Sequence, residues 1–222
     1  KLFQGKIIIV FGARQVGKTT LVKEILQEQG ITGGYFNCDE PDIREAFQNK
    51  TSSELKTFIG EKKLIVIDEA QRVENIGLSL KLLHDTFPEI QILATGSSSF
   101  ELSNKINEPL TGRAYECIMY PFSYKELEDS SSALEIDRTI EHRLIYGMYP
   151  DVHNSGAQEA EENIVQLTKN YLYKDILEFQ HIKNSEALQK LLEALALQIG
   201  QEVSFKELAD CAGIDKNTAS HY

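Results

Sequence analysis

Residues 12–19 read Gly12-Ala13-Arg14-Gln15-Val16-Gly17-Lys18-Thr19, which has the spacing G-x-x-x-x-G-K-[ST] of a phosphate-binding loop. The two glycines allow backbone conformations that a side chain would forbid, so successive N–H groups can point inward at phosphate oxygens. Lys18 adds a charge that can reach the β- and γ-phosphates, and Thr19 offers a hydroxyl to Mg²⁺. The motif predicts an anion site in which Gly12 to Thr20 hold a nucleotide.

The segments on either side of this loop provide the context that the motif requires. The apolar run Ile7-Ile8-Ile9-Val10-Phe11 precedes it and predicts a strand that is buried on both faces, as in a parallel sheet. Leu21, Val22, Ile25 and Leu26 follow at helical spacing, so the loop opens a helix whose positive end favours anions. These features argue against the alternative, a glycine-rich connection in another kind of α/β protein.

Two adjacent acids, Asp68 and Glu69, follow a second buried run, Leu64-Ile65-Val66-Ile67. Ligands of open α/β sheets bind beyond the carboxyl ends of the strands, so these acids should face the nucleotide. We expect Asp68 to hold Mg²⁺ and Glu69 to polarise the attacking water; the alternative is a solvated acidic turn that caps the next helix. The guanine signature N-K-x-D fails at Asn107, which disfavours a GTPase.

Two further positions are candidates for contact with the γ-phosphate. A strand predicted at residues 90–94 ends in Thr95-Gly96-Ser97-Ser98-Ser99, where Thr95 or Ser97 could sense that phosphate. Ser98 or Ser99 could equally cap the following helix. Arg113 immediately precedes a fifth predicted strand at residues 115–120, and it is either a solvated surface residue or an arginine finger for a neighbouring subunit.

Composition and charge restrict the setting in which these motifs act. The net charge of −11 and the pI near 5.0 argue against a broadly basic nucleic-acid surface, although they are compatible with a local basic patch. The three cysteines lie far apart in the sequence and predict free buried thiols in a reducing compartment. The early apolar run is too short for a signal peptide or membrane span, so we expect a cytoplasmic protein without a membrane partner.

The second half of the chain has helical patterning. Beyond the polar break Ser130-Ser131-Ser132, residues 133–146 and 158–179 carry apolar side chains at helix spacing. Residues 188–222 predict a helix-turn-helix unit, with a capping box at Ser204-Phe205-Lys206-Glu207, a turn at Ala212-Gly213 and a cap at Asp215. DNA contact is one interpretation of this unit and packing or protein binding is the other, because the last helix offers few base-reading side chains.

Taken in order, these motifs resemble a prokaryotic family of predicted AAA+ superfamily ATPases. The resemblance rests on residues 12–20, Ile67-Asp68-Glu69-Ala70-Gln71, Thr95-Gly96-Ser97-Ser98, Gly112-Arg113, Pro121-Phe122-Ser123 and Tyr146-Gly147-Met148-Tyr149-Pro150. It implies an α/β P-loop NTPase fold, a three-layer αβα core with a parallel sheet in the order 5-1-4-3-2. It also implies ATP and Mg²⁺ as ligands, oligomers as a possible assembly, and a C-terminal domain with winged-helix and nuclease-like parts, truncated in this chain.

The resemblance divides the chain into an AAA+-like core at residues 1–130, a helical lid at 131–182 and an incomplete winged-helix segment at 183–222. We expect the protein to bind MgATP and to hydrolyse it to drive a conformational or assembly switch, with Arg138 and Arg143 as lid arginines by location only. The alternative is an ATP-gated DNA-binding regulator whose hydrolysis is incidental. A small-molecule kinase is less favoured, because the paired acids suit activation of water.

Overall fold

The computed structural model describes residues 2–28, 33–96, 109–130, 132–169 and 185–221, which form two compact units, Lys1–Ala160 and Glu161–Tyr222. The first unit contains the sheet, and the second is helical. None of the helices in these ranges combines the length and the hydrophobicity that a membrane crossing demands.

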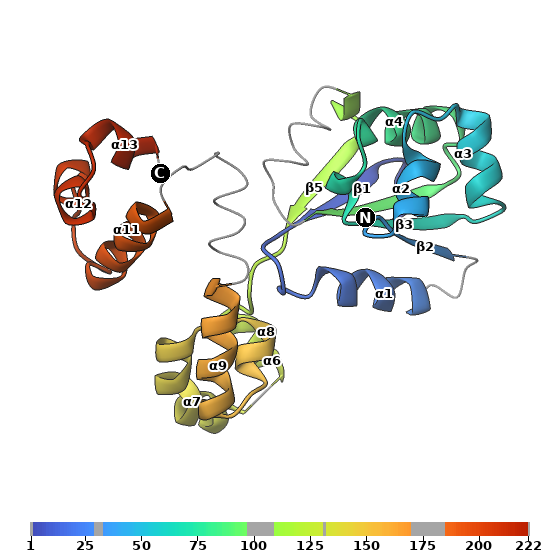
Figure 1. The fold of residues 1–222 in the computed structure, drawn as a ribbon. Helices are drawn as coiled ribbons and strands as arrows, with labels where there is room; N and C mark the ends of the chain where they lie inside the picture. The colour runs from blue at the N-terminus through green and yellow to red at the C-terminus, as the bar shows by residue number, and fades with distance from the viewer. Residues whose placement is uncertain (1, 29–32, 97–108, 131, 170–184, 222) are drawn as a thin grey trace. The chain divides into compact units, whose positions relative to one another are not determined.

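The first unit is built on a five-stranded parallel sheet (Figure 1). Its strands are β1 (Ile7–Phe11), β2 (Gly33–Asn37), β3 (Leu64–Asp68), β4 (Gln91–Gly96) and β5 (Ala114–Ile118). Their order is β2-β3-β4-β1-β5, and every neighbouring pair is parallel. This is the predicted order 5-1-4-3-2 counted from the other edge, so the predicted fold class is confirmed. The phosphate loop follows β1 and the paired acids come at the end of β3, so both lie at the same edge of the parallel sheet, with β4 between the two strands.

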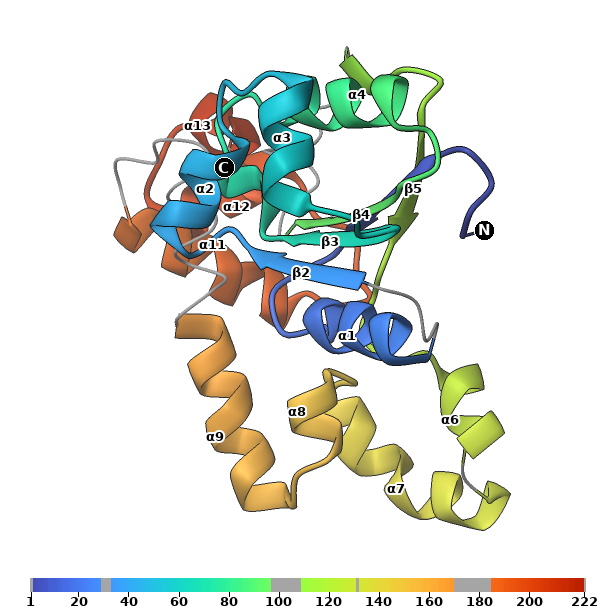
Figure 2. The same ribbon diagram turned by 90° about the vertical axis from the view of Figure 1, so that its right-hand side faces the viewer.

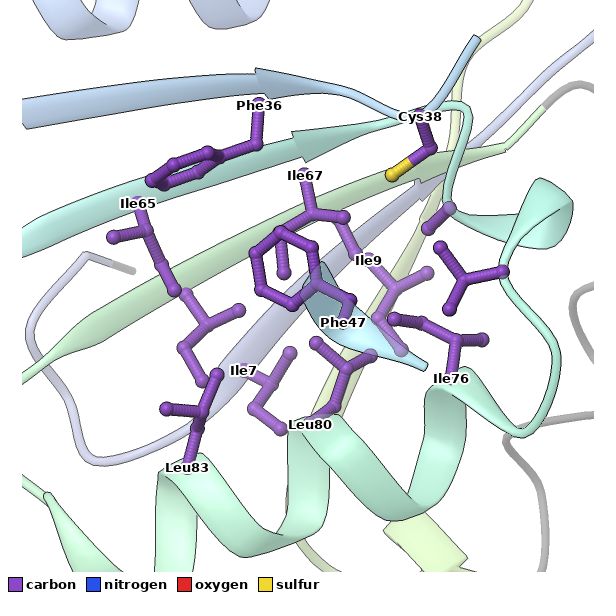
Figure 3. Packing of buried hydrophobic residues seen from close by; sticks show 14 of the residues in the cluster. Ile7, Ile9, Phe36, Cys38, Phe47, Ile65, Ile67, Ile76, Leu80 and Leu83 are labelled. Atoms are coloured by element: carbon purple, nitrogen blue, oxygen red, sulfur yellow. The ribbon is translucent and has the colours of Figure 1, made fainter. Parts of the chain in front are cut away.

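Helices cover both faces of the sheet, and the alternation of side chains along each strand shows why. Ile7 and Ile9 pack with Ile65 and Ile67 against the helices α2 (Pro41–Phe47), α3 (Ser52–Ile59) and α4 (Ile76–Thr86) (Figure 3). The intervening residues of the same strands, such as Ile8 and Leu64, form a second cluster with the helix α1 (Lys18–Glu28). Figure 2 shows α1 on one side of the sheet and α2 to α4 on the other. Burial on both faces explains the unbroken hydrophobic runs.

Local capping signals fix several of these helices. Pro41 occupies the first turn of α2, where its missing N–H costs nothing. The Thr51 hydroxyl accepts from the Glu54 N–H at 3.3 Å, and the Glu54 carboxylate accepts from the Thr51 N–H at 2.9 Å. This capping box begins α3 at Ser52.

Among the described residues between β5 and residue 169 lie the helices α6 (Tyr124–Ser130), α7 (Ala133–Tyr146), α8 (Pro150–His153) and α9 (Ala157–Leu167), the last of which crosses the division between the two units. The bounds of α7 are the predicted ones, because Ser132 and Glu135 form a capping box and Gly147, at φ 81°, ends the helix. Helix α9 covers the start of the predicted helix at 158–179, whose end lies outside the described residues. The compact first unit extends beyond the predicted core boundary at residue 130, and the proposed lid boundary stays a prediction.

The second unit contains α11 (Ser185–Leu197), α12 (Phe205–Ala212) and α13 (Lys216–His221). Its small core holds Leu191, Leu208 and the alanines that face them, including Ala219 of α13. Ser204 accepts from the Glu207 N–H at 3.2 Å, which is one half of the predicted capping box. Gly213 adopts the left-handed conformation after α12, as a helix C-terminal glycine does. The structure thus has two helices joined by a turn at Gly213, while the assignment of residues 188–222 as a helix-turn-helix or winged-helix unit stays a prediction.

The cysteines correct one expectation. All three are free thiols, as predicted, but only Cys38 is buried, whereas Cys117 is partly buried and Cys211 is exposed. Burial, together with the charge of Asp68, raises the pKa of the Cys38 thiol to about 12, so this thiol stays protonated at neutral pH.

Candidate phosphate and metal site

The loop between β1 and α1 has a backbone that only certain residues tolerate. Gly17 has a φ of +97°, and Gln15 has a φ of 61°, both in the left-handed region. A Cβ atom at Gly12 would lie well inside 3.0 Å of the Met119 carbonyl oxygen, because the chain leaving β5 packs directly against the loop. The fixed glycines of the motif therefore serve one turn and one close approach.

Lys18 is buried at the start of α1 and folds over the loop. Its Nζ donates hydrogen bonds to the carbonyl oxygens of Gly12 and Ala13, each at 2.8 Å, and the residue is 5% exposed. The ammonium charge is thereby held against the loop and beside the positive end of the helix. This combination of oriented amides and a buried cation suits a phosphate chain.

Asp68 lies at the carboxyl end of β3, and its carboxylate accepts hydrogen bonds from hydroxyl groups on three other elements. The Thr19 hydroxyl on α1 donates to Asp68 Oδ2 at 2.8 Å, and the Tyr35 hydroxyl on β2 donates to the same oxygen. The Thr95 hydroxyl on β4 donates to Asp68 Oδ1. The carboxylate is 3% exposed. The structure thus brings together Thr19 and Asp68, the two predicted metal ligands, although 49 residues separate them in the sequence.

Hydroxyl and carboxylate oxygens are the donors that Mg²⁺ prefers, so this pair fits a magnesium ion. The fit to Mg²⁺ requires that the hydroxyl groups around Asp68 act as hydrogen-bond donors to its carboxylate. Burial and the adjacent Asp68 carboxylate raise the pKa of Tyr35 well above its ordinary value, so its hydroxyl keeps its proton and remains a donor.

Glu69 follows Asp68 in a left-handed conformation, with φ 53° and ψ 41°. For a residue with a side chain this geometry costs about 1–3 kcal/mol and is concentrated at functional sites. The Glu69 N–H donates to the Thr95 hydroxyl at 3.2 Å, and the side-chain amide of Gln71 donates to the Glu69 carboxylate. Thr95 thus holds the Glu69 backbone, and Gln71 orients the Glu69 carboxylate.

Thr95 links the two acids directly. It is completely buried, it donates to Asp68 and it accepts from the Glu69 N–H. This geometry makes Thr95 a support for the Asp68 carboxylate and for the Glu69 backbone, and its role as a γ-phosphate sensor stays a prediction. Ser97, the other predicted sensor, lies outside the described residues.

Arg113 lies at the other end of the sheet from the phosphate loop of its own chain. Its carbonyl oxygen accepts from the Ile7 N–H at 2.9 Å, at the amino end of β1. Its Nε donates to Asp85 Oδ1 at 2.8 Å, and this hydrogen bond holds the pKa of the Asp85 carboxyl at about 2. Arg113 is therefore separate from the site described above, so any arginine-finger role would act on another subunit. The two lid candidates lie on α7, where Arg138 is exposed and Arg143 is 7% exposed.

The sequence reasoning gave no role to Tyr35 or Gln71, two residues that contact the acids. A signal for Tyr35 exists: it lies two residues before Asn37, and Asn37 pairs with Asp68 in the register of β2 and β3. Because side chains alternate along a strand, Tyr35 shares a face with Asp68. Only the pairing of the strands, which the sequence does not state, makes this visible.

An apolar cavity of about 630 Å³ adjoins the loop. It is lined by Val16 and Leu21 from the loop and α1, and by Met119, Tyr120 and Phe122 from the segment after β5. Its walls are mostly hydrophobic, and Glu126 supplies a polar group at one side. A flat, largely apolar group could enter it next to the phosphate site.

Comparison with known proteins agrees with this geometry. Residues 137–222 match a domain of unknown function (DUF8612). An uncharacterized protein of Haemophilus influenzae is 27% identical over 236 aligned positions, which cover 97% of this chain and 57% of the relative. An uncharacterized protein of Methanocaldococcus jannaschii is 25% identical, with coverage of 95% and 51%. The chain thus spans about half the length of these relatives.

A solved structure described as a Walker-type ATPase of Pyrococcus abyssi shares the fold, with a TM-score of 0.51 and 16% identity. The match covers 96% of this chain and 84% of that one. Residues 4–128, which contain the loop, the paired acids and all five strands, match the family described as AAA domain. The chain therefore belongs to the AAA domain family and has the fold of a P-loop ATPase.

Proposed function

We propose that this protein binds MgATP and hydrolyses the β–γ phosphoanhydride bond. The observation that carries the proposal is the 2.8 Å hydrogen bond between Thr19 and Asp68. It joins the helix that begins at the phosphate loop to the strand end that carries the acids, so one Mg²⁺ ion can be held by both elements next to the phosphates.

Each residue of the site has a role in this proposal. The loop amides and Lys18 bind the phosphates, while Thr19 and Asp68 hold the metal ion. Mg²⁺ supplies charge neutralisation on the β- and γ-phosphate oxygens when it is bound. Glu69 orients the attacking water and accepts its proton, with its own direction fixed by Gln71.

The remaining residues act on the γ-phosphate and on the base. Thr95 or Ser97 contacts the γ-phosphate, and Arg113 completes the site of a neighbouring subunit in a homo-oligomer. The apolar cavity beside Val16 takes the base, and its hydrophobic lining supports a purine. The choice of adenine rests on membership of the AAA domain family.

In the proposed cycle, hydrolysis drives a change of conformation or assembly in a cytoplasmic protein. The turn between α7 and α8 contacts the segment that lines the cavity, since the Phe122 N–H donates to the Met148 carbonyl oxygen at 3.0 Å. A base that fills the cavity would therefore press on a segment that is bonded to this turn. This connection supports α7 and α8, within the predicted lid, as a part that responds to the nucleotide.

Two substitutions test the proposal. Lys18→Ala should abolish ATP binding in a fluorescence or calorimetric titration, because it removes the charge beside the loop. Glu69→Gln should retain ATP but stop phosphate release, because the amide cannot accept the proton of water. Glu89→Gln is the matched control, since this exposed residue precedes β4 at the opposite end of the sheet. Unchanged affinity for Lys18→Ala, or normal release for Glu69→Gln, would contradict the assigned roles.

A second candidate function is an ATP-gated DNA-binding regulator in which hydrolysis is incidental. The helix pair α12 and α13, joined through Gly213, is the observation that favours it. Salt-dependent DNA binding that changes with ATP would support this function. DNA binding that is absent at low salt, with and without ATP, would exclude it.

A further inference from the structure

We propose that Tyr35 is a positioning residue for the metal-binding carboxylate, and that its hydroxyl helps to set the strength with which Mg²⁺ is coupled to ATP. This inference rests on the proposed function of the site. It adds a residue that lies outside the phosphate loop and outside the pair of acids, on the edge strand β2.

The Asp68 carboxylate is oriented by hydrogen bonds to both of its oxygens. The terminal torsion of an aspartate is broad, so the two oxygens of the group are oriented mainly by the donors around them. Thr95 fixes Oδ1, while Oδ2 accepts from both Thr19 and Tyr35. Thr19 is itself a predicted metal ligand, so Tyr35 is the donor to Oδ2 that does not depend on the metal.

The ring of Tyr35 is itself held in place by contacts with neighbouring elements. Tyr35 pairs with Val66 in the register of β2 and β3, so its ring lies on the face of the sheet that α1 covers. Lys23 Nζ lies 4.9 Å from the centre of this ring. Lys23 is one helical turn after Thr19, and the two residues therefore share a face of α1. One side of α1 thus supplies a ligand hydroxyl to Asp68 and a cation that confines the tyrosine ring.

These contacts hold the Asp68 carboxylate in one orientation, which suits the binding of Mg²⁺. Mg²⁺ demands a nearly ideal octahedral arrangement, so a carboxylate that is free to rotate binds it less well than one that is already oriented. A tyrosine that served only to fill space on this face would need its ring and not its hydroxyl. Removal of the hydroxyl alone therefore separates positioning from packing.

The experiment compares ATP affinity with and without the metal in the parent protein and in Tyr35→Phe. A fluorescent ATP analogue is titrated in excess Mg²⁺ and again in EDTA. The dissociation constant in EDTA divided by the dissociation constant in Mg²⁺ measures how strongly the metal ion promotes ATP binding. We expect affinity in EDTA to stay within about twofold, and the ratio to fall by about 3- to 10-fold, the size of the net contribution of one hydrogen bond. Tyr124→Phe, which removes an exposed hydroxyl on α6, is the matched control and should leave the ratio unchanged.

Phosphate release provides a second readout. At saturating ATP, the Mg²⁺ concentration that gives half-maximal release should rise by a similar factor in Tyr35→Phe, while the rate at saturating Mg²⁺ changes by less than about twofold. If the parent shows Mg²⁺ coupling and Tyr35→Phe reproduces it, the role of Tyr35 is overturned and the proposed function stands. If the parent binds ATP equally well in Mg²⁺ and in EDTA, the metal site fails and the role of Tyr35 fails with it.

Discussion

Gly12→Ala tests the close approach on which the phosphate loop depends. The new methyl group would collide with the Met119 carbonyl oxygen, well inside the 3.0 Å limit for real Cβ atoms, and would also touch the Val16 side chain. The Met119 backbone has little freedom to withdraw, because its N–H donates to the Phe11 carbonyl oxygen at 2.7 Å. Either the loop or the end of β5 must therefore move.

The expected cost follows from these contacts. Forcing a methyl group into a packed site costs about 1–3 kcal/mol, and loss of the hydrogen bond between Met119 and Phe11 adds about 1 kcal/mol. Replacing glycine with alanine restricts the unfolded chain and returns about 0.4–1 kcal/mol. The net destabilisation is about 2 kcal/mol, which corresponds to a drop of about 4–8 °C in the melting temperature of a domain of this size. A displaced loop should also bind ATP at least about tenfold more weakly, since this needs a change of only about 1.4 kcal/mol.

Gly34→Ala is the control that distinguishes this reasoning from a general intolerance of alanine. Its Cβ would collide at a similarly short range, but with the flexible stem of Lys62 and not with the backbone. We expect its melting temperature and its ATP affinity to stay close to those of the parent. Thermal melting and nucleotide titration of both variants measure the two effects. The reasoning is refuted if Gly12→Ala melts within about 2 °C of the parent and binds ATP normally.

Two further substitutions probe other parts of the first unit. Arg113→Ala should preserve ATP binding and lower phosphate release only where the protein is oligomeric, as measured at increasing protein concentration; a defect in a strict monomer would exclude the finger role. His153→Phe should flatten the pH dependence of stability. Burial, and then the charges of Arg143 and His142, lower the pKa of His153, so the unfolded chain binds its proton more readily. Stability should fall as the pH drops through about 6.5, and melting curves between pH 7.5 and 5.5 should lose this slope in the variant, whose ring can still stack on Phe122.

The elements around the site could be predicted because their signals are local. The apolar runs at Ile7 and Leu64 are unbroken, so burial on both faces was readable without any partner strand. The helix at 133–146 was likewise predicted from its own apolar spacing after a polar break, and the structure begins α7 at the same residue with a capping box at Ser132. The order of the strands came from the family resemblance, since no periodicity in the sequence states which strands are neighbours.

The contacts within the site could be predicted only in part. The phosphate loop and the paired acids are contiguous motifs, so their residues were identified from spacing alone. Tyr35 was missed because its contact with Asp68 depends on the register of β2 and β3, and Asp85 was missed because its contact with Arg113 depends on the packing of α4 beside the start of β5. Contacts between residues on different elements cannot be predicted from a short stretch of sequence that contains only one of the two residues.

The site shows features that lower the stability of a protein in the absence of a ligand. The buried Asp68 carboxylate accepts hydrogen bonds from three neutral hydroxyls, and Glu69 keeps a left-handed backbone. A buried charge with uncharged partners and a strained residue both cost free energy, which a bound cation and its phosphates would offset. We therefore expect MgATP to raise the melting temperature by more than the same concentration of ATP does in EDTA, where only the phosphate loop contributes to binding. At a ligand concentration of one hundred times the dissociation constant, the stabilisation is about 2.7 kcal/mol. A melting temperature that rises equally with ATP in EDTA and with MgATP would show that the two acids contribute nothing to the bound state.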